Sequence, residues 1–286
     1  MSIYIPSHIK ITVHGDDGNV KYTQNYADFL SSPNFEVQAE IYGRTLIDIL
    51  TQEAYINANM QLNHVFTGNV KADATRIIGS IAESLVVDWC NKYPEVNRTL
   101  GMYARGGVRR SNVLDDYIAV ATGSQRTKNL FEQYYNPCDT QRDILWVNKY
   151  NNEDQLLAIS PRQSRSSAKP AGLQVKASQD GISYVLPCIQ DYHYPILYFD
   201  LNGDWGAVYK KVLQDHPSSI LINPDELQHE MRHVLRGYFN ILVEVINGNR
   251  SLERVIKDAQ YNGDSVLLAG LDTSEFTFNP KIILPK

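Results

Sequence analysis

Three polar residues on two predicted strands have the types and spacing that metal-assisted phosphodiester hydrolysis requires. Asp143 precedes the apolar run 144–147, which predicts a strand that opens with a carboxylate. Gln174 and Lys176 lie two residues apart in a second apolar segment, so they project from the same face of a strand. If the two strands pair, oxygen ligands for Mg²⁺ meet an ammonium group that can offset phosphate charge and orient or help activate water.

A carboxylate on a predicted helix can complete this group. Glu83 is the only charged residue in the segment 77–87, and helical spacing places it between Val86 and Val87 rather than on a polar face. A carboxylate among apolar neighbours needs a partner. The residues alone leave two partners open, a metal ion or an arginine.

These four residues, in the order Glu83, Asp143, Gln174 and Lys176, resemble the motifs of the PD-(D/E)xK nuclease superfamily, which includes restriction endonucleases and related DNA-repair nucleases. The family has a helix that carries a Glu, a strand that opens with Asp, and a strand with (E/Q)xK. The resemblance covers about residues 73–200. It implies a restriction-endonuclease-like core and hydrolysis of double-stranded DNA, usually by a homodimer.

The resemblance also implies a role for each residue. Asp143, Glu83 and Gln174 would be ligands of Mg²⁺, and Lys176 would be the catalytic lysine. The chain departs from the family at two positions, because Arg142 stands where the motif has proline and Gln174 where a carboxylate is commoner. The resulting expectation is a type II-like restriction or defence endonuclease that depends on Mg²⁺.

Charge is distributed unevenly along the 286 residues. The chain has 27 Lys and Arg against 32 Asp and Glu, a net charge of −5 that excludes a wholly polycationic nucleic-acid binder. Residues 98–176, however, hold twelve basic and seven acidic residues. Two basic clusters in this region, at 105–110 and 161–169, contain Gly or Ser and could contact phosphates or be solvated loops. The residues expected to bind DNA are Arg105, Arg109, Arg110, Arg162, Arg165 and Lys169.

A rival motif predicts a different chemistry. The run His229-Glu230-Met231-Arg232-His233 fits HExxH, in which two histidines bind Zn²⁺ and the Glu is a general base, and Glu253 could be a third ligand. The neighbouring cation Arg232 is unfavourable beside zinc. A zinc-dependent metallopeptidase therefore stays as an alternative, together with a non-catalytic nucleic-acid-binding protein.

Other short motifs carry less weight. The pair Asp115-Asp116, before a predicted strand at 117–121, could replace Asp143 as a metal ligand. The sequence has no GxxxxGK[ST] or GxGxxG, which argues against a nucleotide-driven motor or a Rossmann enzyme. It also has no GxSxG elbow of a serine hydrolase.

The elements that must position these residues alternate between helix and strand, which predicts an α/β or α+β fold with a mixed central sheet flanked by helices. Strands are expected at 143–147, 172–177, 194–201 and 219–223, and an N-terminal hairpin at 9–13 and 20–23. Helices are expected at 25–30, 37–58, 73–92, 225–246 and 252–259. We expect an N-terminal hairpin and helical region, residues 1–70, packed on a core of residues 71–286.

The compartment follows from what the sequence lacks. No apolar run approaches the roughly 20 residues that span a bilayer, and the first residues show no secretory signal. The three cysteines are widely spaced without a CxxC pair. These features predict a cytoplasmic protein without membrane association.

Overall fold

A computed structural model describes most of the chain, in two compact units. It describes residues 10–14, 19–25, 28, 35–107, 112–158, 169–191, 194–227, 231–255 and 266–269. One unit combines Met1–Ala74 with His233–Lys286, and the other is Thr75–Arg232. The boundary between Ala74 and Thr75 lies close to the one expected at residue 70. Residues 233–286, however, group with the N-terminal segment and not with the expected core.

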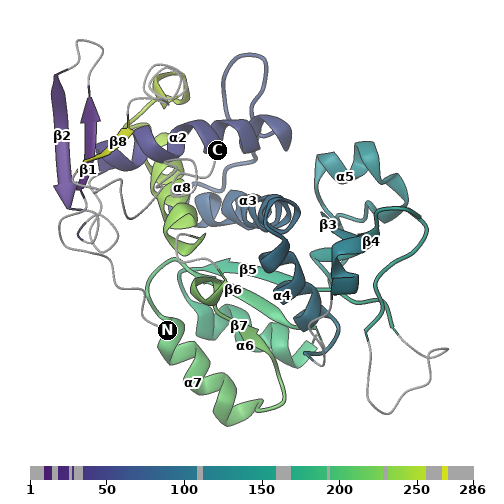
Figure 1. The fold of residues 1–286 in the computed structure, drawn as a ribbon. Coiled ribbons are helices and arrows are strands. Elements are labelled where there is room, and N and C mark those ends of the chain that lie inside the picture. Colours follow the sequence, from purple (N-terminus) through teal and green to yellow (C-terminus); the bar gives the residue numbers. More distant parts are fainter. Residues whose placement is uncertain are drawn as a thin grey trace. The chain divides into compact units, whose positions relative to one another are not determined.

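The first unit contains a small antiparallel sheet and two long helices. Strand β1 (Lys10–His14) pairs with β2 (Val20–Asn25) and with β8 (Val266–Ala269) (Figure 1). The predicted N-terminal hairpin is thereby confirmed. Helix α2 (Phe35–Gln52) and most of α8 (Met231–Ile246) belong to the same unit.

The second unit holds the strands that carry the candidate chemistry. Strand β3 (Tyr117–Ala121) pairs antiparallel with β4 (Ile144–Asn148). Strands β5 (Gln174–Ser178), β6 (Ile196–Asp200) and β7 (Leu221–Ile222) form a parallel sheet in that order. Helices alternate with these strands, so the α/β class is confirmed.

The two sheets of this unit meet next to Asp143. Ile144 at the start of β4 forms an antiparallel bridge with Leu173, the residue before β5. Both backbone hydrogen bonds between Ile144 and Leu173 are 2.9 Å long. This bridge brings the start of β4 to the start of β5, as expected if the two predicted strands pair.

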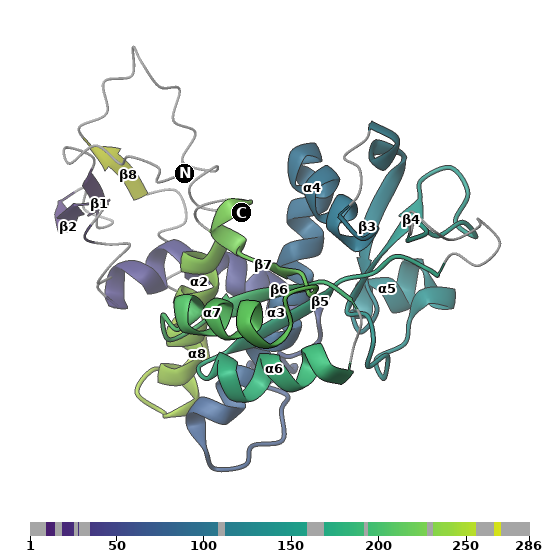
Figure 2. The ribbon, with the colours of Figure 1, turned by 90° about the horizontal axis from the view of Figure 1, so that it is seen from below.

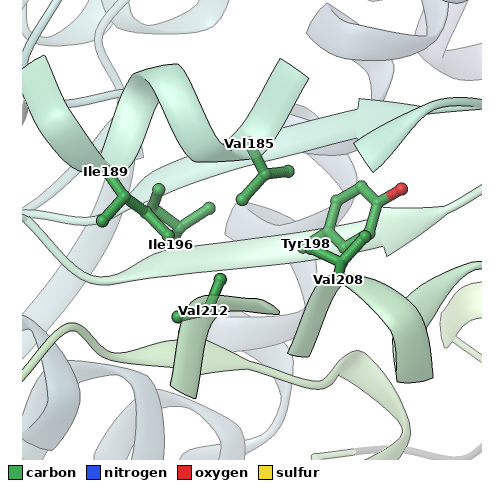
Figure 3. Close-up of a cluster of buried hydrophobic side chains, with 6 residues drawn as sticks. All are labelled: Val185, Ile189, Ile196, Tyr198, Val208 and Val212. Atoms are coloured by element: carbon green, nitrogen blue, oxygen red, sulfur yellow. The ribbon is translucent and has the colours of Figure 1, made fainter. Parts of the chain in front are cut away.

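Helices cover both faces of the β5–β6–β7 sheet. Helix α3 (Val70–Lys92), most of which belongs to this unit, lies on one face, and α6 (Gly181–Asp191) and α7 (Trp205–Asp215) lie on the other (Figures 1 and 2). Apolar residues four apart on α6 and on α7 point at the sheet and bury a shared core with β6 (Figure 3). The core residues are Val185, Ile189, Ile196, Tyr198, Val208 and Val212.

A buried asparagine ties β4 to the helix before β3. Asn97, on α4 (Pro94–Ala104), donates from Nδ2 to the carbonyls of Leu114 and Tyr117, each at 3.0 Å. Its Oδ1 accepts from Trp146 Nε1 at 2.7 Å. Both donor hydrogens of the amide, and one of the two lone pairs of its oxygen, are therefore used at these three contacts.

The remaining described helices are short. They are η1 (Asn112–Asp116), α5 (Gln125–Leu130), η2 (Glu132–Tyr134) and η4 (Pro224–Glu226). Over the ranges that the structure describes, every helix is too short or too polar to cross a lipid bilayer.

Candidate active site

Asp143 and Lys176 form an ion pair where β4 and β5 begin. Lys176 Nζ lies 2.9 Å from Asp143 Oδ2, and each side chain is only 14% exposed. The same Oδ2 accepts from the Val175 backbone N–H at 2.7 Å. Burial lowers the pKa of Lys176, but the charge of Asp143 and its hydrogen bond raise it more, so the pKa lies above its ordinary value. Lys176 is therefore a cation at neutral pH.

Gln174 is fully buried beside this pair. Its Nε2 donates to the Thr140 carbonyl at 2.8 Å. A carbonyl can accept only from the nitrogen of the amide, so this bond fixes the orientation of the side chain. The amide oxygen Oε1 is buried with no hydrogen-bond partner among the described residues. A buried acceptor without a partner is costly and marks a position where a ligand could bind.

Glu83 comes to the same region from α3. A Cβ atom placed on Gly123, in the turn after β3, would lie 3.7 Å from Glu83 Oε2. The neighbouring Thr122 donates its N–H to the Asp143 carbonyl at 2.9 Å. Glu83 and Asp143 also both act electrostatically on Tyr184, whose pKa each of them raises. The four residues selected from the sequence therefore lie in one neighbourhood.

Two residues of α6 that were not selected from the sequence also belong to this neighbourhood. Tyr184 and Cys188 are four residues apart, and both are affected by the charges of Lys176 and Asp143. Burial raises the pKa of each group and Lys176 lowers it, with a net increase for both. The signal in the sequence was the i, i+4 spacing after the (E/Q)xK strand, which places both side chains on one face of a helix.

The oxygen atoms at this site are of the types that bind hard divalent cations. Asp143 and Glu83 offer carboxylates and Gln174 offers its unpartnered amide oxygen, which are ligand types that Mg²⁺ accepts. Among the described residues, Asp143 Oδ1 accepts no hydrogen bond, whereas Oδ2 accepts two. In the part of the chain that the structure describes, no three His, Cys, Asp or Glu residues gather as a metal site, so an amide would have to complete the set.

The alternative carboxylates, Asp115 and Asp116, lie elsewhere. Ala121 of β3 is opposite Ile144 and Tyr117 is opposite Asn148, so Asp115 and Asp116 are at the far end of this strand pair. Five residues of strand separate the two ends by about 16 Å. Asp115 is instead paired with Arg98, whose hydrogen bond lowers the pKa of the Asp115 carboxyl.

The expected DNA-binding residues are only partly described. Arg109, Arg110, Arg162 and Arg165 lie outside the described residues. Arg105 caps the end of α4, and its Nε is buried with no partner in the described part of the chain.

Lys169 is exposed on an antiparallel arm between β4 and β5, where Ala158 donates its N–H to the Lys169 carbonyl at 2.8 Å. Lys169 is the last residue of the second basic cluster, so the end of that cluster is linked through this arm to β5, which carries Gln174 and Lys176.

The HExxH motif is also only partly described. His229 and Glu230 lie outside the described residues, while His233 is on α8. Arg232 between them is within 2.6 Å of Asp225 and 3.4 Å of Asp200. The zinc hypothesis therefore stays a prediction.

Comparison with known proteins gives no relative on which to base an assignment. No protein-family model, curated protein or solved structure matches the chain.

Proposed function

We propose that the protein is a Mg²⁺-dependent endonuclease that hydrolyses phosphodiester bonds of double-stranded DNA. The observation that carries this proposal is the group at the start of β4 and β5. There Lys176, in a buried pair with Asp143, shares β5 with Gln174, whose buried amide oxygen has no partner among the described residues. A site built only for stability would satisfy that oxygen or replace it by an apolar group.

Each side chain has a role in this proposal. Asp143 is fixed by the Val175 N–H at Oδ2, and with Gln174 and Glu83 it would hold the cation. Lys176, a cation 2.9 Å from Asp143, would offset the charge on the scissile phosphate and orient the attacking water. When bound, Mg²⁺ would stabilise the negative charge that develops on the phosphate oxygens.

The order of the elements supports the restriction-endonuclease-like assignment. A helix with Glu83 comes first, then a strand preceded by Asp143, then a strand with Gln174-Val175-Lys176. Lys169, exposed on the arm between β4 and β5, would contact the DNA backbone. On this basis we infer a restriction or defence role and a homodimer, because a duplex presents two strands to be cut.

The test is cleavage of plasmid DNA, prepared with and without base methylation, in Mg²⁺ and in EDTA. We expect cutting in Mg²⁺ only, and a loss of about 100-fold or more in Lys176→Met. Lys210→Met is the matched control, because Lys210 is exposed on α7. Plasmid left intact by the wild-type protein in Mg²⁺ would refute the proposal.

Two further outcomes would indicate the alternatives. DNA binding that Lys176→Met does not change, without cutting by either protein, would indicate a non-catalytic binding protein. Stoichiometric zinc that is lost in His233→Ala would indicate the metallopeptidase. Sedimentation equilibrium with and without a DNA duplex tests the proposed homodimer.

A further inference from the structure

The turn that leads into Asp143 is organised around one carboxylate. Asp139 Oδ1 accepts from the backbone N–H groups of Gln141 and Arg142, at 2.9 and 3.1 Å. Its Oδ2 pairs with Arg142 Nη2 at 3.2 Å, and the Asp139 side chain is 10% exposed. These three contacts fix the backbone from Asp139 to Arg142, so the direction in which Asp143 leaves the turn is fixed as well.

The same turn holds Gln174 as well as Asp143. Its Thr140 carbonyl is the acceptor that orients the Gln174 amide, at 2.8 Å. On the other side, Thr122 Oγ1 donates to the Arg142 carbonyl at 2.9 Å, and the Thr122 N–H donates to the Asp143 carbonyl at 2.9 Å. A displaced turn would therefore move both predicted metal ligands together.

Gly172 makes room for the arginine of this turn. A Cβ atom at Gly172 would lie 2.5 Å from Arg142 Cγ and Cδ and 3.1 Å from its Cβ. These atoms are the base of the arginine side chain and not its mobile end, so an alanine would displace Arg142 from Asp139. Gly172 also precedes the Leu173-Gln174 segment directly, which links the arginine to the second strand of the site.

We propose that Asp139 and Arg142 are positioning residues that hold Asp143 and Gln174 in their ligand arrangement. The inference rests on the proposed function, because the two ligands are those of that proposal. It also explains why Arg142 stands at the position where the PD-(D/E)xK motif has proline. Proline fixes φ through its ring, whereas here an ion pair across the turn restricts the same backbone.

The test compares Asp139→Asn with Asp115→Asn. Asn can still accept the two backbone hydrogen bonds at residue 139, but it loses the ion pair with Arg142. Asp115→Asn breaks another Asp–Arg pair of the same unit, at the far end of β3, where Arg98 Nε lies 2.7 Å from Asp115 Oδ1. A change seen only in Asp139→Asn therefore reports on this turn, and not on a general effect of losing an Asp–Arg ion pair.

Two measurements are made on each folded protein. In the metal-free protein, exchange of the Val175 amide hydrogen, which is bonded to Asp143 Oδ2, should become about tenfold faster in Asp139→Asn. Calorimetric titration should show that Asp139→Asn binds Mg²⁺ about 10- to 100-fold more weakly than the wild-type protein. Asp115→Asn should match the wild-type protein in both measurements.

Gly172→Ala provides a second, chemically unrelated perturbation. It displaces Arg142 without changing a charge, and we expect the same two effects. Wild-type values for Val175 exchange and Mg²⁺ affinity in both Asp139→Asn and Gly172→Ala would overturn the inference. If the wild-type protein neither binds Mg²⁺ nor cuts DNA, the proposed function fails instead, and Val175 exchange still decides whether the turn positions Asp143.

Discussion

The Asp143–Lys176 pair allows a quantitative prediction about stability. Two unit charges 2.9 Å apart attract by about 6 kcal/mol at an effective dielectric constant of 20, and the loss of hydration opposes much of this. Removal of one partner leaves the other charge buried. At 14% exposure we expect Asp143→Asn or Lys176→Met to lower the free energy of unfolding by about 3 kcal/mol each.

The double variant should recover most of this loss. Asp143→Asn with Lys176→Met removes both charges of the pair, and the Asn can still accept the Val175 hydrogen bond. We therefore expect a total loss of about 1 to 2 kcal/mol and a coupling energy of at least about 3 kcal/mol. Because the pKa of Lys176 is raised, its contribution is fully present at neutral pH and is lost only as the pH rises through that pKa.

The assay is urea unfolding at pH 7 in EDTA, followed by tryptophan fluorescence. All three tryptophans, Trp89, Trp146 and Trp205, belong to the unit Thr75–Arg232, so the signal reports this unit alone. Lys211 and Asp215 form the matched control pair, with the same two atom types at the same 2.9 Å but 47% and 41% exposed, and their coupling should be below about 1 kcal/mol. Equal coupling energies for the two pairs would refute the reasoning from burial.

Three further substitutions test other parts of this unit. Gln174→Leu removes the unpartnered amide oxygen, so we expect unfolding within about 1 kcal/mol of wild type but weaker Mg²⁺ binding by calorimetry. Asn97→Ala leaves three buried partners unsatisfied and should cost more than about 3 kcal/mol in urea unfolding. Val208→Ala opens a cavity in the α6–α7 core and should cost about 1 to 3 kcal/mol by the same assay.

Elements with strong apolar patterning could be predicted from the sequence. The strands at 143–147 and 172–177 were each placed to within two residues, because the first contains a continuous apolar run and the second alternates apolar with polar residues. Helix α6 was missed, since Gly181 and Pro187 resemble helix-breaking signals. The helix predicted at 37–58 ends at Gln52, and two residues later Ala54 has a positive φ of 59°. Of the helix predicted at 25–30, the structure describes only Asn25, which ends strand β2, and Asp28.

The residues selected from the sequence lie close together, but their contacts could not be predicted. Spacing identified Gln174 and Lys176 because two residues on one strand face need no tertiary information. The partners of those residues come from elsewhere in the chain: Thr140 is 34 residues from Gln174, and Asp143 is 33 from Lys176. Asp139 could not be found by motif, because its relevance depends on which turn folds against the strands.

The charge of the site predicts how DNA binding should depend on metal. Without a bound cation, the carboxylates of Asp143 and Glu83 oppose the approach of a phosphate. A bound divalent cation would offset their charge. At constant ionic strength, fluorescence anisotropy should therefore show DNA binding about tenfold tighter in Ca²⁺ than in EDTA, and Asp143→Asn should reduce this difference. Equal affinities in Ca²⁺ and EDTA would mean that DNA phosphates do not approach this cluster, and the basic residues would then bind DNA at another surface.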